Sequence, residues 1–239
     1  LQLTGGSVRF LAGSAMTLPE DFVIQGTVLE LSTGSAQSYS RTVALNAGGL
    51  GGSDPFDLTA GDLEWNGGAL FGPGVLTLRG NTRLLIDGPD DKTLEREVLV
   101  QDKAQWNSGN VIGGGLLHVA DTGNFSVLTG GAFQGNLLAQ GRFDLFAPDQ
   151  VAHFSGGFDA QAEVRLRAGT LRLAGNGEST AAFNVFSGGA VEFAGGTFDF
   201  HGRDASLTGP GRALFTGGTV VFRDGASYAM GSERITGGT

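Results

Sequence analysis

The stretch FAGGTFDF (residues 193–200) is followed 22 residues later by FTGGTVVF (residues 215–222). Looser copies of the same phrase occur along the chain: LTGGSVRF (3–10), LTAGDLEW (58–65), LRAGTLRL (166–173) and FSGGAVEF (186–193). Several spacings between copies lie near 20 to 22 residues. A recurrence at such a period is typical of repeat proteins, in which each repeat is one structural unit stacked on the next.

The end of each copy alternates apolar, charged and apolar residues, as in Leu63-Glu64-Trp65. Alternation with a period of two predicts a strand with one buried face and one exposed face. The glycine pair before each tail suits a tight corner, because glycine adopts positive φ without a Cβ clash. The inward positions predict a core that includes Phe10, Trp65, Trp106, Leu173, Phe193, Phe200 and Phe222.

The overlap of two copies indicates how many strands one repeat contains. FSGGAVEF and FAGGTFDF share Phe193, so two corners lie seven residues apart within a period of 20 to 22. This predicts an all-β parallel β-helix, or β-solenoid, with three short strands per coil. At roughly 4.8 Å per stacked strand, about eleven coils form a rod on the order of 50 Å long. A β-sandwich, which also has short strands and turns, is the alternative.

A longer repeat supports the solenoid and bounds its domain. LEWNGGALFGPGVLTL (63–78) aligns with AQWNSGNVIGGGLLHV (104–119), an offset of about two coils. Residues 1–239 therefore form one predicted domain. Its least regular part is 12–57, where SAMTLPEDF (14–22) and NAGGLGGSDPF (46–56) are interpreted as loops on the solenoid.

Composition excludes several classes of protein. The chain of 239 residues has 43 glycines but only 6 prolines and no period of three, so it is not collagen. Apolar residues make up 40% and include 17 phenylalanines, which is enough for a core. The absence of cysteine excludes disulfides, zinc–thiolate sites and cysteine nucleophiles. A net charge of −9 disfavours binding to nucleic acid and to anionic membranes. No apolar segment is long enough to span a membrane, so no membrane insertion of this segment is predicted.

Three segments, 92–131, 168–200 and 205–222, resemble the repeats of large secreted bacterial surface proteins, the filamentous-haemagglutinin-type adhesins and autotransporter passenger domains. The resemblance implies a right-handed β-helix, secretion to the bacterial cell surface, and a role in adhesion, biofilm matrix or display of a distal domain. Host or matrix glycans or proteins are the implied partners. The chain starts and stops inside copies of the phrase, so we expect a segment of a longer protein that associates end to end.

Two tryptophans are candidates for sugar stacking or for the core. Trp65 and Trp106 each occupy the last apolar position of a strand, which favours the core. The following Asn66 and Asn107 are expected to form an internal ladder or to cap the turn.

The charged segment DGPDDKTLERE (87–97) contains Asp87, Asp90 and Asp91, candidate calcium ligands because calcium prefers several carboxylate oxygens. Lys92 and Arg96 lie between the acids, which favours a solvated loop or strands with surface ion pairs instead. GGLGGSDPF (48–56) half resembles a calcium-binding nonapeptide but lacks one aspartate. The sequence predicts no bound metal and no cofactor.

No catalytic residues are predicted. The histidines His118, His153 and His201 are far apart, and no G-x-S-x-G or phosphate-binding loop is present. The alternative to an adhesive segment is a polysaccharide lyase or glycoside hydrolase, which would need outward carboxylates to converge. Glu64, Glu192 and Asp199 are the candidates for lining one face.

Overall fold

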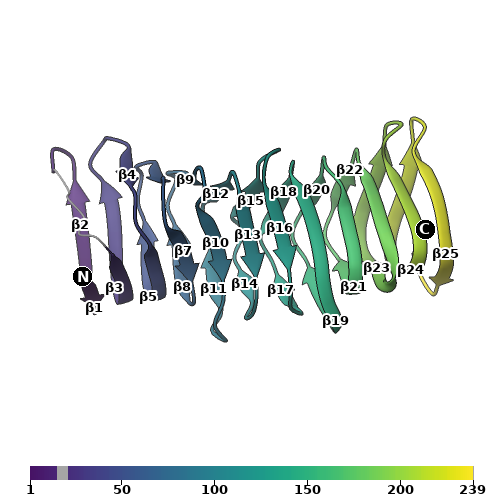
Figure 1. Cartoon of the computed structure of the whole chain (residues 1–239), viewed down its shortest axis with the longest axis horizontal. Helices are drawn as coiled ribbons and strands as arrows, with labels where there is room; N and C mark the ends of the chain where they lie inside the picture. The colour runs from purple at the N-terminus through teal and green to yellow at the C-terminus, as the bar shows by residue number, and fades with distance from the viewer. Residues whose placement is uncertain (15–20, 239) are drawn as a thin grey trace.

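A computed structural model describes residues 1–14 and 21–238 of the chain. All of its regular elements are strands, and the described residues contain no helix. Parallel strands are stacked as a β-solenoid of about 11 turns. Figure 1 shows the resulting rod, with the N-terminus at one end and the C-terminus at the other.

Each turn contributes strands to three parallel stacks, which we call the first, second and third sheets. The first sheet contains β1 (Gln2–Thr4), β7 (Asp62–Trp65), β10 (Arg83–Ile86), β13 (Lys103–Trp106) and β16 (Asn124–Val127). The second contains β2 (Ser7–Leu11), β8 (Gly68–Phe71), β11 (Lys92–Leu94), β14 (Val111–Ile112) and β17 (Gly131–Phe133). The third contains β4 (Gln37–Tyr39), β6 (Phe56–Leu58), β9 (Leu76–Leu78), β12 (Glu97–Val100), β15 (Leu116–Val119), β18 (Asn136–Ala139), β20 (Phe158–Ala160) and β22 (Gly177–Ser179).

Longer strands pass through a corner and belong to more than one sheet. They are β3 (Phe22–Ser32), β5 (Val43–Gly51), β19 (Arg142–Phe154), β21 (Val164–Leu173), β23 (Ala182–His201), β24 (Ser206–Arg223) and β25 (Ser227–Ile235). The start of each pairs in the first sheet and a later part pairs in the second. The last parts of β23 and β24 also reach the third sheet.

The repeated phrase forms corners of the coil. The second glycine of the phrase has φ +65° at Gly196 and +73° at Gly218. A Cβ placed on Gly196 would lie 2.4 Å from the carbonyl oxygen of Gly175 in the preceding coil. The corner therefore excludes side chains both by its left-handed backbone and by the close approach of the next coil.

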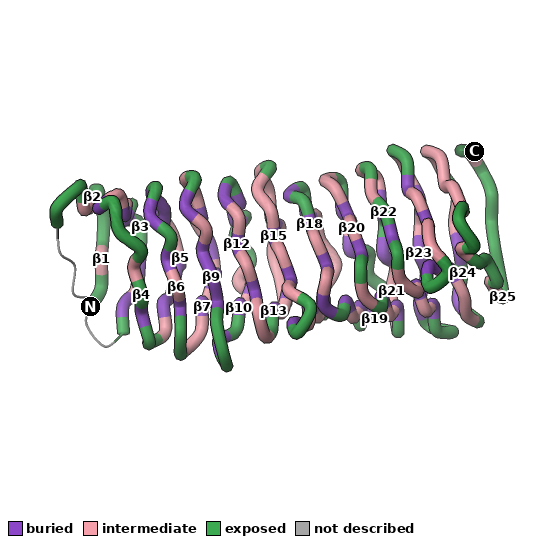
Figure 2. The backbone as a smooth tube through the Cα atoms, turned by 90° about the horizontal axis from the view of Figure 1, so that it is seen from above, coloured by how far each residue is buried: buried purple, intermediate pink, exposed green. Residues whose placement is uncertain are grey.

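The core is the column of inward side chains between the three sheets, and Figure 2 marks in purple the backbone positions of the buried residues along the rod. Trp65, Trp106, Leu173, Phe193 and Phe200 are buried in it. Inward rings also stack from coil to coil: Phe200 and Phe222 lie 4.8 Å apart between centroids, with an interplanar angle of 6°. Such contacts add to the burial of apolar area.

Two expected core residues are only half-buried. Phe10 in β2 and Phe222 in β24 pack against the core from its two ends. At Phe10, β2 is paired with only one neighbouring strand, β3. At Phe222, β24 is likewise paired only with β23. Their rings consequently lack the second neighbouring coil that covers a ring in the middle of the rod.

Part of the stretch expected to be irregular is regular. Residues 46–51 do not form a loop, because β5 continues through them and pairs with β3 and β8. Glycine is needed here: a Cβ on Gly48, which has φ +88°, would lie 2.1 Å from the carbonyl oxygen of Thr27, and one on Gly51 would clash with Phe71. Most of the other expected loop, 14–22, lies outside the described residues.

Asp54, just after β5, closes the next corner. Its carboxylate accepts hydrogen bonds from the backbone N–H and hydroxyl of Thr33, at 2.6 and 2.7 Å, and from the backbone N–H of Gly34 at 3.0 Å. Its residue surface is only 3% exposed. The aspartate of the half-matching nonapeptide is thus engaged by the protein's own donors.

We expect stability to fall at acid pH through Asp54. Burial raises the pKa of Asp54, but the hydrogen bonds from Thr33 and Gly34 outweigh it and place the pKa below its ordinary 3.8. The stabilisation is present above pH 3.8 and is lost as pH falls through the lower folded-state value. Thermal melts of wild type and Asp54→Asn across this window check it. An equal acid sensitivity of both proteins would contradict the assignment.

Candidate functional site

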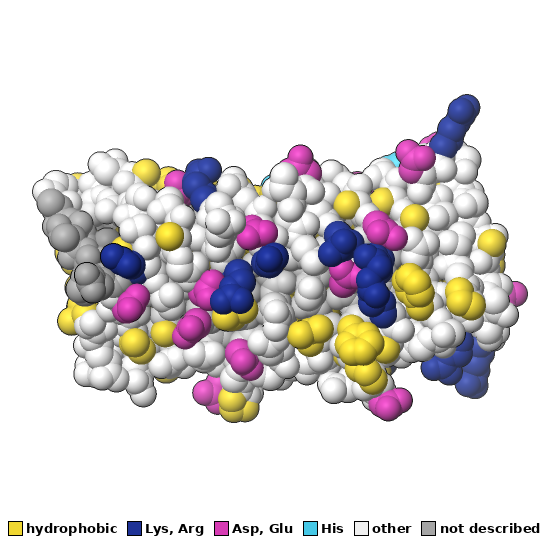
Figure 3. All heavy atoms as spheres, viewed as in Figure 1, with side chains coloured by type: hydrophobic (Ala, Val, Ile, Leu, Met, Phe, Trp, Pro, Cys, Tyr) yellow, Lys and Arg dark blue, Asp and Glu magenta, His cyan; other side chains and the backbone are white. Residues whose placement is uncertain are grey.

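The first sheet carries a row of cations along the rod. Arg83 pairs in register with Lys103, Lys103 with Asn124, and Asn124 with Arg142, so these side chains occupy the same outward position in successive coils. Successive positions are separated by about one strand spacing, roughly 4.8 Å. Two more cations lie beside this row in β21: Arg165 is in register with Asp144, and Arg167 follows the inward Leu166 at the corner. We call Arg83, Lys103, Arg142, Arg165 and Arg167 the cationic row; Figure 3 shows the Lys and Arg side chains gathered along the middle of this face.

Asp144 lies among three arginines of the cationic row. Its carboxylate is within ion-pairing distance of Arg142 at 2.6 Å, Arg167 at 3.4 Å and Arg165 at 3.5 Å. Three guanidinium groups therefore share one carboxylate. Arg142 and Arg167 retain side-chain exposures of 46% and 44%, so their charges remain accessible to a ligand.

An exposed apolar stripe runs beside the cationic row at the corner between the first and second sheets. Leu128, Phe146 and Phe186 form this stripe and are 42%, 53% and 41% exposed. Each directly follows an inward residue of the first sheet, and those inward residues pair from coil to coil. Arg167 occupies the same position in the coil between Phe146 and Phe186, and its guanidinium lies 5.8 Å from the centroid of the Phe186 ring. Hydrophobic side chains gather here in Figure 3.

Neither tryptophan is available to stack on a sugar. Trp106 is fully buried, 5.9 and 6.0 Å between ring centroids from Phe133 and Phe154, and its Nε1 donates to the carbonyl oxygen of Gly109 at 3.0 Å. Trp65 is buried in the same way and donates to Gly68.

The residues that follow the tryptophans form a polar ladder at the same corner. Asn66 donates from Nδ2 to Asn46 Oδ1 at 2.9 Å, and Asn107 donates to the Asp87 carboxylate at 3.4 Å. Ser108 and the backbone N–H of Gly88 also donate to Asp87. These donors, led by Ser108 and Gly88, hold the pKa of Asp87 below its ordinary value. The ladder occupies in the N-terminal coils the position that the apolar stripe occupies farther along.

The candidate calcium loop already contains a cation. Lys92 is not solvated as expected: it begins β11 at an inward position and is fully buried. Its Nζ donates to the carbonyl oxygens of Gly88 and Asp90 at 2.9 and 2.8 Å. Burial lowers the pKa of Lys92, while the charges of Asp87, Asp90 and Asp91 raise it.

Arg96 is the second cation that the sequence placed wrongly in solvent. It lies between β11 and β12, is 4% exposed, and donates from Nη2 to the carbonyl oxygen of Gly74. Burial lowers its pKa to about 10. The two cations of the charged segment are therefore internal, whereas Asp90, Asp91 and Glu95 are exposed, and the Lys92 ammonium is bound by backbone carbonyl oxygens.

The carboxylates suggested for an enzymatic face do not meet. Glu64 lies in the first sheet, Glu192 in the second-sheet part of β23, and Asp199 in its third-sheet part. A different pair is adjacent: Asp159 and Glu178 are register partners in the third sheet. Burial raises the pKa of Asp159; the backbone N–H of Glu178, which donates to Asp159 at 3.1 Å, opposes this, and the charge of Glu178 adds to it.

The histidines lie apart from one another. His118 bridges Glu97 and Gln140, with ring nitrogens 3.2 and 2.8 Å from their oxygens, in the third sheet. His153 lies in the second sheet in β19 and His201 ends β23. Among the residues with described positions, no three His, Asp or Glu side chains gather as a metal site would require. The described residues also contain no helix that is long and apolar enough to cross a bilayer.

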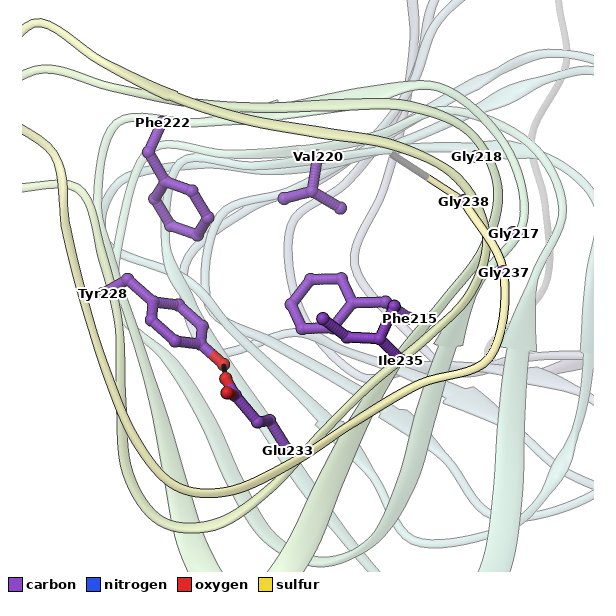
Figure 4. Close-up of a pocket in the computed structure, with 10 residues that line it drawn as sticks. All are labelled: Phe215, Gly217, Gly218, Val220, Phe222, Tyr228, Glu233, Ile235, Gly237 and Gly238. Atoms are coloured by element: carbon purple, nitrogen blue, oxygen red, sulfur yellow. Dashed lines mark hydrogen bonds between the residues drawn. The ribbon is translucent and has the colours of Figure 1, made fainter.

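A hollow of about 490 Å³ opens at the end of the rod formed by β24 and β25 (Figure 4). Phe215, Phe222 and Ile235 line it, together with Tyr228, whose hydroxyl donates to Glu233. These side chains occupy inward positions: Phe215 stacks on the buried Phe193 at 5.5 Å between centroids. The hollow is thus a continuation of the core.

We expect this end to mediate the predicted end-to-end association, with Ile235 and Glu233 acting in opposite directions. Ile235 is 70% exposed and would be covered by a stacked coil. Glu233 would place a carboxylate in that apolar contact, which is costly. Ile235→Lys should decrease the apparent mass in concentration-dependent light scattering, and Glu233→Leu should increase it. A clean monomer at high concentration for both wild type and Glu233→Leu would contradict end-to-end association.

Comparison with family models, with curated proteins and with solved structures finds no match for this chain. The resemblance to secreted bacterial adhesins accordingly stays a prediction from the repeat sequence.

Proposed function

We propose that this chain is an extracellular structural and adhesive segment of a bacterial surface protein, which presents ligand-binding side chains along the side of a rod. The observation that carries the proposal is the exposed apolar stripe of Leu128, Phe146 and Phe186 beside the cationic row. Exposed apolar side chains gathered on one surface and bordered by charged residues, here with Arg167 between Phe146 and Phe186, are a feature of interaction sites. Aromatic residues and arginine are also the residue types most enriched where binding energy is concentrated.

The rod itself supports a mechanical role. The backbone of each coil is hydrogen-bonded to that of the next coil through parallel strand pairs, and the hydrophobic core is continuous along the rod axis. A solenoid of this kind holds its lateral side chains at fixed spacings. Fold alone does not assign function, so the proposal rests on the lateral surface.

The test is a binding screen of the full chain against glycan and matrix-protein arrays, with the bound glycans examined for cleavage. We expect saturable binding and intact glycans. Phe146→Ser combined with Phe186→Ser should weaken binding about tenfold, a loss of about 1.4 kcal/mol. Leu11→Ser, an exposed apolar residue of β2 at 58% exposure, is the matched control and should bind normally. No binding on any array would overturn the adhesive role and leave a scaffold.

A carbohydrate-active enzyme is the second candidate, favoured by Asp159 and Glu178. A carboxyl group with a raised pKa beside a second carboxylate is the arrangement that glycosidases use as acid and base. The two lie on an open sheet, next to each other in register. Release of reducing ends from a polysaccharide, abolished by Asp159→Asn, would establish this function and displace the adhesive one.

A further inference from the structure

We propose that the cationic row binds an extended anionic polysaccharide, with uronate or sulfate groups, lying along the rod axis. The inference rests on the proposed adhesive function and names the class of ligand.

In the first sheet, the outward side chains from β13 to the start of β21 carry an excess of positive charge on an acidic protein. Four cations, Lys103, Arg142, Arg165 and Arg167, outnumber the two carboxylates there, those of Asp144 and Glu163. Glu163 accepts a hydrogen bond from the neutral Asn184 at 2.6 Å. Lys103 is exposed, and the described part of the chain offers it no ion-pair partner. This face therefore attracts anions although the net charge is −9.

One buried polar atom on this face, Asn124 Oδ1, makes no hydrogen bond with any described residue. Arg165 Nε also makes no hydrogen bond, but it lies at ion-pairing distance, 3.5 Å, from the Asp144 carboxylate. Buried polar atoms are nearly always hydrogen-bonded, so the unpaired amide oxygen of Asn124 needs an explanation. A sugar chain supplies the missing donor, because its hydroxyl groups donate to an amide oxygen.

Asn124 lines a hollow between neighbouring coils. The hollow has a volume of about 110 Å³ and is bounded by Arg83, Lys103, Gln105, Asn124 and Ser126. Its polar walls combine Lys103 and the Asp62-paired guanidinium of Arg83 with amide and hydroxyl groups, and Leu84, Leu85 and Ala104 complete the lining. This mixture suits a carboxylate or sulfate group attached to a hydroxyl-rich ring, since charge-assisted bonds fix the anion and neutral groups bind the hydroxyls.

The spacing of the row favours a polymer aligned with the axis. Arg83, Lys103 and Arg142 recur at multiples of one strand spacing, about 4.8 Å, which is close to the length of one pyranose unit in an extended chain. The apolar stripe runs parallel to the row, so the C–H faces of the same sugars can pack on Phe146 and Phe186. An additional apolar hollow of about 130 Å³ adjoins Phe186 and continues the stripe toward the C-terminus.

Nucleic acid is the other anionic polymer to consider, and the face suits it less well. Its affinity comes mainly from neutralising many consecutive phosphates with lysine and arginine. Here Arg83 is already engaged by both carboxylate oxygens of Asp62, and Asp144 and Glu163 interrupt the row. Isolated anionic groups separated by hydroxyls match this pattern better.

The test measures binding of the intact chain to polygalacturonate, heparin, neutral dextran and single-stranded DNA by isothermal titration calorimetry. The site variant is Lys103→Gln with Arg167→Gln. The matched control is Arg203→Gln with Arg212→Gln, two exposed arginines outside the cationic row with the same loss of charge. Circular dichroism melts verify that both variants remain folded.

We expect polygalacturonate or heparin to bind the wild type. The affinity should fall about tenfold in the site variant, and it should also fall about tenfold when salt is raised from about 50 to 200 mM. The control should bind as wild type does. Binding to only one of the two polymers assigns the anion as uronate or sulfate. Equal loss in both variants, equal binding of dextran, or tighter binding of DNA would overturn the inference. If the glycan or matrix-protein arrays show binding but no anionic polysaccharide binds, only this inference is overturned. If no array shows binding, the proposed adhesive function is overturned as well.

Discussion

Replacement of Trp106 by alanine is expected to lower the free energy of unfolding by about 3–5 kcal/mol, the usual cost of emptying a large aromatic site in a core. Trp106 is completely buried and contacts Phe133 and Phe154 in the following coils. Its loss would remove edge-on ring contacts and the hydrogen bond from Nε1 to Gly109. The cavity would lie in the middle of the rod, where strands on both sides hold the backbone in place.

Urea unfolding followed by circular dichroism measures this effect. Gln105→Ala is the matched control, because Gln105 is the adjacent outward residue of β13 and surface changes usually stay within about 0.5 kcal/mol. A loss below about 1 kcal/mol for Trp106→Ala would mean that the tryptophan is not in a close-packed site.

Replacement of Lys92 is expected to produce the second large loss, about 2–4 kcal/mol for Lys92→Ala. The ammonium group satisfies the carbonyl oxygens of Gly88 and Asp90, and the surrounding aspartates remain negative without it. Lys92→Met fills nearly the same volume without donating, so it separates the hydrogen bonds from the packing. We expect the methionine variant to lose stability too, because the two carbonyl oxygens stay unpaired.

Thermal melts with and without calcium complete this test. The ammonium group already occupies the position between the carbonyl oxygens, so calcium should leave the wild-type melting temperature unchanged. A Lys92→Met protein as stable as wild type would contradict the role given to the hydrogen bonds. A marked rise in wild-type melting temperature with calcium would contradict the placement of the lysine as the internal cation.

The period and the alternation were sufficient to predict the solenoid and most of its core. Trp65 and Trp106 could be placed inward because each ends an apolar–polar–apolar strand, and the structure buries both. The exposure of Phe10 and Phe222 depends on how many coils flank each ring, which a single phrase does not encode.

The lateral site could not be predicted in the same way. Glu64, Glu192 and Asp199 occupy equivalent places in their phrases, yet corners turn them onto three different sheets. Phe146 and Phe186 each follow an inward residue of the first sheet, and only the stacking of the coils shows that such outward side chains gather on one surface. A signal did exist for Lys92: Lys92-Thr93-Leu94 alternates, and Leu94 is inward, but the surrounding charges favoured a solvated loop.

The lateral site depends on one central claim, that residues about 20 apart in the sequence are neighbours in successive coils. The chain has no cysteine, so an intramolecular disulfide in a double-cysteine variant can only join the two introduced cysteines. Gln105 and Ser126 are register partners in the first sheet, and Gln105 and Asp144 are two coils apart.

Mild oxidation of two double-cysteine variants, with mass spectrometry of the disulfides, is the most direct test. We predict that Gln105→Cys with Ser126→Cys forms an intramolecular disulfide, because one strand spacing, about 4.8 Å, lies within the Cα separation that a disulfide spans. Gln105→Cys with Asp144→Cys, at roughly twice that spacing, should remain reduced. Disulfide formation in the second variant and not in the first would contradict the register on which the fold and the lateral site are built.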